Sequence, residues 1–70
     1  MIKNLFNLEP KDRFKLPTSD EIFTVKKYVM KYRPILGKVL HLIAYDLKGK
    51  EAWFITNFLV EVLEKENQDE

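Results

Sequence analysis

The chain has 70 residues, of which 46% are hydrophobic and 33% are charged, with a formal net charge of +1. A chain of this size forms one domain with a small core, because it buries only about 60% of its unfolded surface, which excludes a deep catalytic cleft. Cysteine is absent, so a disulfide-stapled secreted scaffold and a thiolate metal site are also excluded. Neither a signal peptide nor a membrane-spanning apolar run is recognisable, and we therefore expect a cytoplasmic protein.

The small net charge conceals an uneven distribution. Residues 1–50 contain eleven basic and five acidic side chains, whereas residues 51–70 contain one basic and six acidic ones. Two interpretations fit: a solvated surface with an acidic end, or a basic binding face screened by that end. We divide the chain into an N-terminal extension (1–9), a folded barrel (10–63) and an acidic tail (64–70).

The first predicted strand is Arg13–Leu16, where apolar and polar residues alternate. The segment from Pro17 to Glu21 is rich in turn formers and predicts a reversal of the chain. Residues 22–25 are β-branched or aromatic, which favours a second strand over the competing helix that would begin at Ser19.

The alternation of the second strand slips shortly after it begins. If Phe23 and Val25 face the core, a period of two would also bury Lys27. A bulge at Lys26 and Lys27 avoids this burial, because one extra residue shifts the alternation by one position. We therefore predict a bulge there, with Tyr28 and Met30 returned to the core.

The middle of the chain predicts a loop, a central strand and a hairpin. Pro34 ends pairing near Arg33, so residues 31–38 form the second loop, and Gly37 opens the next strand. Residues 39–45 are almost wholly apolar, which indicates a strand that contacts protein on both faces. Residues 46–50 form a hairpin turn, in which Gly49 supplies a positive φ, and residues 51–55 return as a strand.

The end of the ordered region has two interpretations. Residues 56–58 read as a break and residues 59–63 as a closing strand, but apolar side chains from Phe58 to Leu63 also fit a helix that begins at Thr56. Val60 and Val62 favour the strand, and a barrel needs a fifth strand to close. The predicted fold class is all-β: a small five-stranded barrel with a one-turn break before the last strand.

The segment 49–63 carries a pattern of residue types at fixed places: a turn glycine, a small residue before an apolar strand, then a hydroxyl residue, asparagine, an aromatic residue and an aliphatic one. These are Gly49, Ala52, Phe54, Thr56, Asn57, Phe58 and Leu59. This ending resembles that of SH3 domains, and residues 16–25 are similar to the diverging turn of that family. The resemblance implies an SH3-like small barrel.

The same segment departs from the SH3 pattern in its groove. Ile55 stands where the family has a proline, and Phe58 lacks the tyrosine hydroxyl that bonds a peptide. The resemblance therefore implies the geometry of a binding module rather than recognition of proline-rich peptides. A short chain with ten lysines and two arginines also resembles small accessory proteins of bacteriophages and other mobile elements, which would imply a modulator of a host protein.

No constellation of residues predicts catalysis. His41 is the only histidine, and no thiol or suitably spaced carboxylate would complete a triad or a metal site around it. The two glycines are too few for a phosphate-binding loop. We expect no enzymatic activity, no cofactor and no metal, with His41 a half-buried histidine of the core.

Two binding hypotheses remain, each with a simpler alternative. The first is a protein partner, bound by loops 16–21 and 32–38 with five aromatic or polar candidates, although Trp53 and Phe58 would equally serve as core residues. These candidates are Tyr32, Arg33, Trp53, Asn57 and Phe58. An exposed, contiguous apolar patch would favour this hypothesis.

The second hypothesis is a nucleic acid bound by interleaved basic and aromatic side chains, which a solvated strand surface would also explain. The candidates are Lys26, Lys27, Tyr28, Lys31 and Lys38, joined by the neighbouring Tyr32 and Arg33. We expect no membrane association. Residues 39–45 are apolar enough on both faces to leave open a homo-oligomer.

Overall fold

The computed structural model describes residues 1–63 as one antiparallel sheet and a single turn of 3-10 helix. The elements are β1 (Ile2–Asn4), η1 (Leu5–Asn7), β2 (Arg13–Lys15), β3 (Ile22–Arg33), β4 (Gly37–Asp46), β5 (Glu51–Phe54) and β6 (Leu59–Leu63). Their order across the sheet is β1-β6-β2-β3-β4-β5. The all-β prediction is confirmed, with six strands instead of five.

The additional strand lies in the first nine residues. β1 pairs with β6, so that Ile2 lies opposite Glu61 and Asn4 opposite Leu59. Leu5 and Leu8, just after β1, are fully or almost fully buried. Residues 1–9 are therefore part of the sheet and the core. Residues 59–63 form a strand, which settles the choice between strand and helix, and the predicted acidic tail lies outside the described residues.

Aromatic rings fill the centre of the core. Phe14 of β2 stacks on Phe23 of β3 with ring centroids 5.7 Å apart, and both rings meet the edge of Phe54 from β5. Leu42 and Ala44 of β4 pack against them, and each is completely buried. Two consecutive strands and one distant strand thus converge on one group of aromatic side chains, which in a chain this short supplies much of the buried apolar area.

The predicted bulge is confirmed, because the register of β3 against β4 shifts between Val25 and Lys27. Tyr28 turns toward the core as predicted and donates a 2.6 Å hydrogen bond from its hydroxyl to the carbonyl oxygen of Leu8. Met30 does not: it is 58% exposed, because it lies past the part of β3 that pairs with β2, where β3 pairs with β4 alone among the described strands. The prediction that Met30 belongs to the core is wrong.

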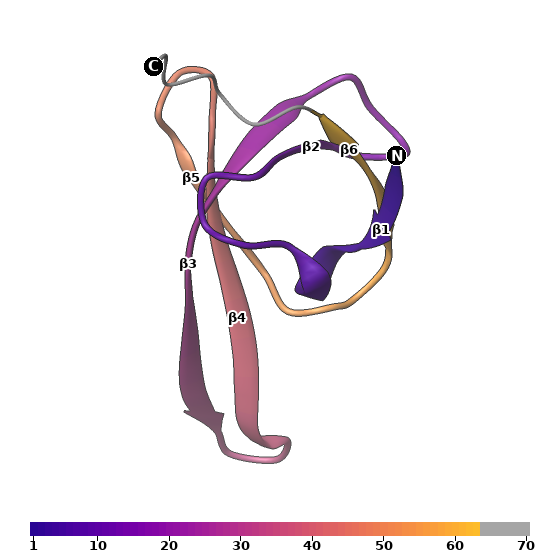
Figure 1. Ribbon diagram of the computed structural model, residues 1–70. Helices are drawn as coiled ribbons and strands as arrows, with labels where there is room; N and C mark the ends of the chain where they lie inside the picture. Colours follow the sequence, from indigo (N-terminus) through magenta and orange to yellow (C-terminus); the bar gives the residue numbers. More distant parts are fainter. Residues whose placement is uncertain (64–70) are drawn as a thin grey trace.

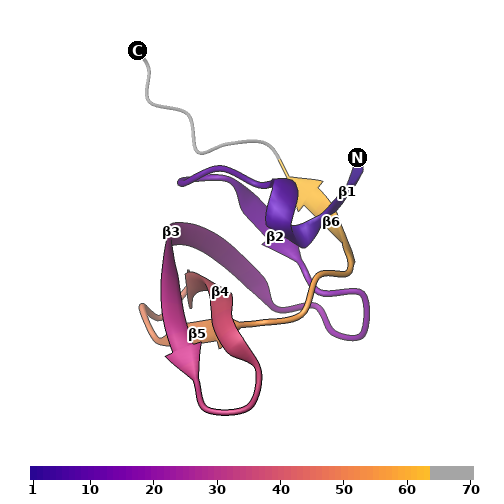
Figure 2. The ribbon, with the colours of Figure 1, turned by 90° about the horizontal axis from the view of Figure 1, so that it is seen from below.

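The segment between β5 and β6 closes the molecule against its own N-terminal part. The backbone N–H of Leu5 donates to the carbonyl oxygen of Phe58 at 2.8 Å, and the N–H of Phe6 donates to Oδ1 of Asn57 at 3.0 Å. In Figure 1 this part of the chain forms a ring with β1, β2 and β6. Figure 2 shows β1, β2, β6 and η1 on one side of the molecule and β3, β4 and β5 on the other.

The ends of β3 and β4 extend well past this ring as a two-stranded hairpin (Figure 1), which we call the arm (residues 29–41). β2 pairs with β3 only up to Thr24, and β5 pairs with β4 only from Leu42 onward. The two strands of the arm therefore pair only with each other. The predicted loop 31–38 is shorter than expected, because pairing continues to Arg33 and Gly37.

Candidate functional site

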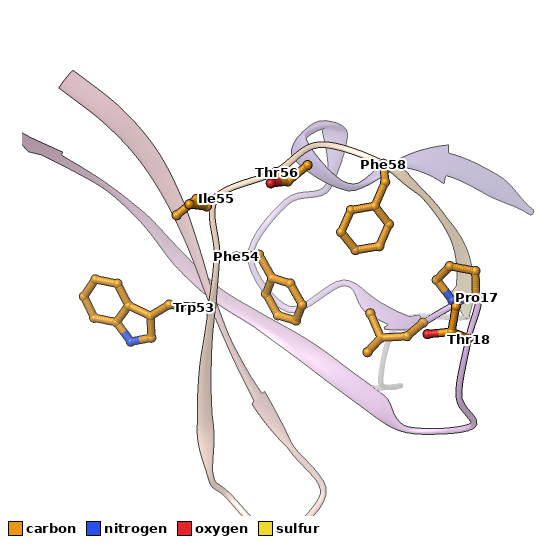
Figure 3. A pocket seen from close by; sticks show the side chains of 8 residues that line it. Pro17, Thr18, Trp53, Phe54, Ile55, Thr56 and Phe58 are labelled. Atoms are coloured by element: carbon orange, nitrogen blue, oxygen red, sulfur yellow. The ribbon is translucent and has the colours of Figure 1, made fainter. Parts of the chain in front are cut away.

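An open apolar hollow lies beside the aromatic core, between the chain reversal after β2 and the segment that follows β5. Its volume is about 440 Å³, and its lining comprises Leu16, Pro17, Thr18, Trp53, Phe54, Ile55, Thr56 and Phe58. Figure 3 shows the rings of Phe54 and Phe58 directed into it, with Pro17 and Thr18 on the opposite wall. The polar side-chain groups of this lining are the two threonine hydroxyls and the indole N–H of Trp53, and none is charged, so the hollow suits an apolar side chain rather than a charged ligand.

Trp53 lies at the rim of the hollow and points away from it (Figure 3). Its indole is 45% exposed and packs edge-on against His41, with ring centroids 5.6 Å apart. The ammonium of Lys31 lies 4.7 Å from the centroid of the indole ring, a cation–π arrangement. Trp53 therefore belongs to the outer face at the base of the arm.

Asn57 has a structural role and is not part of the hollow. Its carboxamide oxygen accepts the hydrogen bond from the N–H of Phe6, and Asn57 does not line the hollow. The residue predicted as part of a contact surface thus fastens η1 to the segment before β6.

The arm has two different faces, because directly opposite residues of an antiparallel pair point to the same side. Val29, Lys31 and Arg33 lie opposite His41, Val39 and Gly37 on the outer face. Met30 and Tyr32 lie opposite Leu40 and Lys38 on the other face, which continues the core side of the sheet. Tyr32 is 74% exposed there.

The turn that ends the arm presents aliphatic side chains to solvent. Ile35 is 95% exposed and Leu36 68% exposed, and both follow Pro34 directly. Gly37 adopts a φ of +80° at the return into β4, a conformation that favours glycine. The tip of the arm is thus a tight, apolar turn with little of its side-chain surface covered.

Arg33 is held in place by a buried histidine. Nη2 of Arg33 lies 2.8 Å from Nε2 of His41, and Nδ1 of His41 lies 3.0 Å from the carbonyl oxygen of Val39. A guanidinium can only donate and a carbonyl can only accept, so these contacts require the neutral imidazole with its proton on Nδ1. His41 is completely buried, more than the half-burial predicted, and acts as a support for Arg33.

The charge of the arm is of one sign. Between Glu21 and Asp46 the chain has no carboxylate and five basic side chains, namely Lys26, Lys27, Lys31, Arg33 and Lys38. Lys26, at the bulge, is paired with Glu51, and its hydrogen bond is the main reason why the pKa of that carboxyl is lowered. The remaining four lie on the arm or at its base.

The structure separates the predicted protein-binding residues. Tyr32 and Arg33 are on the arm, whereas Phe58 lines the hollow and Asn57 is bonded to Phe6 without lining the hollow. Trp53 stands between the two regions. Among the residues predicted to contact nucleic acid, Lys27, Lys31 and Lys38 are exposed near or on the arm, Lys26 is paired and the Tyr28 hydroxyl is bonded inside.

Several residues of these two regions were not among the individual candidates, although the predicted contact loop 32–38 includes the tip of the arm and Ile55 was placed in the groove by the SH3 resemblance. The walls of the hollow include Ile55 and Thr56, whose apolar or hydroxyl character alone does not distinguish them from ordinary strand residues. The exposed tip residues Ile35 and Leu36 carry a detectable signal: two large aliphatic residues between a proline and a glycine in a hairpin turn, where polar residues are usual.

Within residues 1–63, no three His, Cys, Asp or Glu side chains gather in a way that could hold a metal ion. In that same part of the chain, no helix has the length and apolarity to cross a membrane. No family model, curated protein or solved structure matches the chain. The hollow and the arm are therefore the two features from which a function is inferred.

Proposed function

We propose that this chain is a non-catalytic binding module that engages a protein partner through the apolar hollow. The observation that carries the proposal is the convergence of two distant segments, residues 16–18 and residues 53–56 with Phe58, on one open apolar surface. Aromatic and aliphatic side chains that remain accessible on a small domain are typical of protein contact sites.

The chemistry of the hollow limits the kinds of ligand that it can bind. Its walls offer carbon atoms from Pro17, Ile55 and Phe58 and no charged side chain. A polar metabolite would lose hydration there without gaining compensating hydrogen bonds, which disfavours it. An apolar side chain presented by an exposed segment of another protein gains contact area at no such cost.

We further infer an SH3-like barrel as the architecture behind this surface. Support comes from the positive φ of Gly49, +86°, in the turn before β5, and from the break between β5 and β6 at residues 55–58. Within this proposal the hollow corresponds to the surface beside that break. A role as a small accessory protein of a bacteriophage or mobile element, acting on a host protein, is the biological setting that we propose.

The test places a charge in the hollow. Ile55→Asp adds a carboxylate to one wall, and the matched control Leu47→Asp makes the same change at an exposed aliphatic residue of the turn between β4 and β5. Tagged wild type and both variants are used to capture proteins from a cell lysate. The captured protein is then purified and its affinity is measured by calorimetry.

We expect one protein to bind the wild type and Leu47→Asp with equal affinity and to bind Ile55→Asp at least tenfold more weakly. Circular dichroism of both variants checks that the fold is retained. A partner that binds Ile55→Asp as well as the wild type contradicts the proposal. So does the absence of any partner in stoichiometric amount.

A further inference from the structure

We propose that the arm is a separate binding element for duplex DNA, in which the apolar tip enters a groove and the basic side chains of the arm contact phosphates. The arm is the part of the described chain that projects from the ring, and it carries basic but no acidic side chains. This inference concerns a different surface from the hollow and does not depend on it.

The dimensions of the arm fit a groove. From Val29 to Arg33 the strand has five residues, each paired across the hairpin. At about 3.4 Å a residue these span about 15 Å, more than the roughly 8 Å depth of a groove in B-DNA. Two-stranded ribbons enter either the major or the minor groove, and proteins that wedge apolar side chains between base pairs do so from the minor groove.

The charges lie where phosphates would be met. Arg33 and Lys38 flank the turn at the end of the arm, and Lys31 lies two residues behind Arg33 on the outer face. His41 takes one of the five N–H donors of the Arg33 guanidinium and fixes its position. A guanidinium held in place loses less side-chain freedom when it binds a phosphate oxygen.

The tip residues are of the kind that intrude between base pairs. Proteins that bend DNA insert proline, isoleucine or leucine side chains at a base step and kink the duplex. Here Pro34, Ile35 and Leu36 follow one another at the tip of the hairpin, with Ile35 95% exposed. Solvent exposure of Ile35 and Leu36 has no use in the folded monomer, since neither contributes to its core.

The charge of the arm also favours DNA over a protein as its binding partner. Typical protein contact surfaces are depleted of lysine, whereas the arm carries Lys31 and Lys38 beside Arg33 and no carboxylate to balance them. A second copy of the arm is an unfavourable occupant, because it would bring the same positive charges together. Duplex DNA complements both features, because its phosphates match the positive charge of the arm and its stacked bases offer apolar surface to the aliphatic tip.

The experiment measures anisotropy of a fluorescent 30-base-pair duplex at 50 and 200 mM NaCl, with the single strand and polyglutamate as competitors. About three phosphate contacts predict a slope of log K against log salt near −2.7, that is, about 40-fold weaker binding at the higher salt. The variant Lys31→Gln/Arg33→Gln/Lys38→Gln should bind at least tenfold more weakly at 50 mM. Its control, Lys3→Gln/Lys11→Gln/Lys48→Gln, removes the same charge elsewhere and should stay within threefold of the wild type.

The contribution of the tip is measured separately. Ile35→Ser/Leu36→Ser keeps every charge, and energy transfer between dyes on the two ends of the duplex reports bending. We expect the wild type to shorten the end-to-end distance and this variant to lose the shortening. Circular dichroism confirms that each variant is folded, which is expected because the changed side chains are exposed.

Four results would overturn the proposal: no binding at 50 mM NaCl, equal losses in the arm and control triple variants, tighter binding of the single strand than of the duplex, or equal competition by polyglutamate. Unchanged bending by the Ile35→Ser/Leu36→Ser variant would overturn the role of the tip. Ile55→Asp, which tests the hollow, should leave DNA binding unchanged. The two proposals can therefore fail independently.

Discussion

Removing one hydroxyl, by Tyr28→Phe, tests how the base of the arm is fastened to the rest of the molecule. The Tyr28 hydroxyl donates to the carbonyl oxygen of Leu8 at 2.6 Å, across 20 positions of sequence. The ring itself meets Phe6 edge-on at 6.3 Å, and phenylalanine would keep that contact. The substitution therefore isolates the hydrogen bond.

The expected loss of stability follows from this geometry. A net hydrogen bond contributes about 1 kcal/mol, and a partly buried carbonyl left without its donor costs more, so we expect a loss of about 1–2 kcal/mol. In a domain of this size each kcal/mol lowers the melting temperature by about 4–8 °C. The melting temperature should thus fall by about 5–15 °C.

The effect should also depend on alkaline pH. Burial, and secondarily the negative charge of Asp12, raise the pKa of Tyr28 in the folded protein above its ordinary value of 10.0. The unfolded state therefore loses this proton first as the pH rises, and the stabilisation contributed by the neutral hydroxyl is complete below pH 10 and declines above it. The phenylalanine variant has no such proton.

Urea unfolding followed by circular dichroism at pH 7 and at pH 10.5 measures both effects. The control is Tyr32→Phe, which removes the same hydroxyl from an exposed ring of the arm and should change the free energy of unfolding by less than about 0.5 kcal/mol. The reasoning is refuted if Tyr28→Phe is as stable as the wild type at pH 7. It is also refuted if the difference between them does not shrink at pH 10.5.

Substitutions at two further residues test the turn between β4 and β5. Gly49 has a φ of +86° with open space around it, so Gly49→Ala should lower the free energy of unfolding by about 1 kcal/mol through backbone strain alone. Gly49→Asn should lower it by less, because asparagine adopts a positive φ more readily. Equal losses of the two variants in urea unfolding would contradict this reasoning. Asp46 accepts hydrogen bonds from the backbone N–H groups of Lys50 and Lys48, and the bond from Lys50 is the main cause of its lowered pKa. A carboxyl whose pKa is lower in the folded state stabilises the fold when the pH is above its unfolded pKa, and this stabilisation is lost as the pH falls. Asp46→Asn has no such carboxyl. Between pH 5 and pH 2.5 the urea midpoint of this variant should therefore drop less than that of the wild type.

Local patterns in the sequence were sufficient to predict most of the strands. The break in alternation after Val25 predicted the bulge, because burying Lys27 would have been too costly. Val60 and Val62 correctly predicted a strand over a helix. β1 was missed because Ile2–Asn4 has no alternation of its own and is fixed only by pairing with β6, almost sixty residues away.

The two candidate sites were less predictable, because exposure is a property of the whole fold. Met30 and Tyr32 follow the same alternation as Tyr28, and they are exposed because they lie on the arm, past the part of the sheet that the other elements within residues 1–63 cover. The support of Arg33 by His41 likewise depends on the pairing of β3 with β4. Residue type was sufficient to single out Trp53 and Phe58 as candidates. It could not show that Phe58 points into the hollow while Trp53 points away from it.

The pairing of the first strand with the last has a consequence for biosynthesis. Ile2 reaches its partner Glu61 only after synthesis has passed residue 61, and η1 likewise forms its bond to Phe58 only after residue 58 has been made. While translation proceeds, the N-terminal segment therefore has no partner, and Leu5 and Leu8 are without their buried positions. The ring can close only once Leu63 has left the ribosome, whereas the arm, whose strands are separated by three residues, can form much earlier.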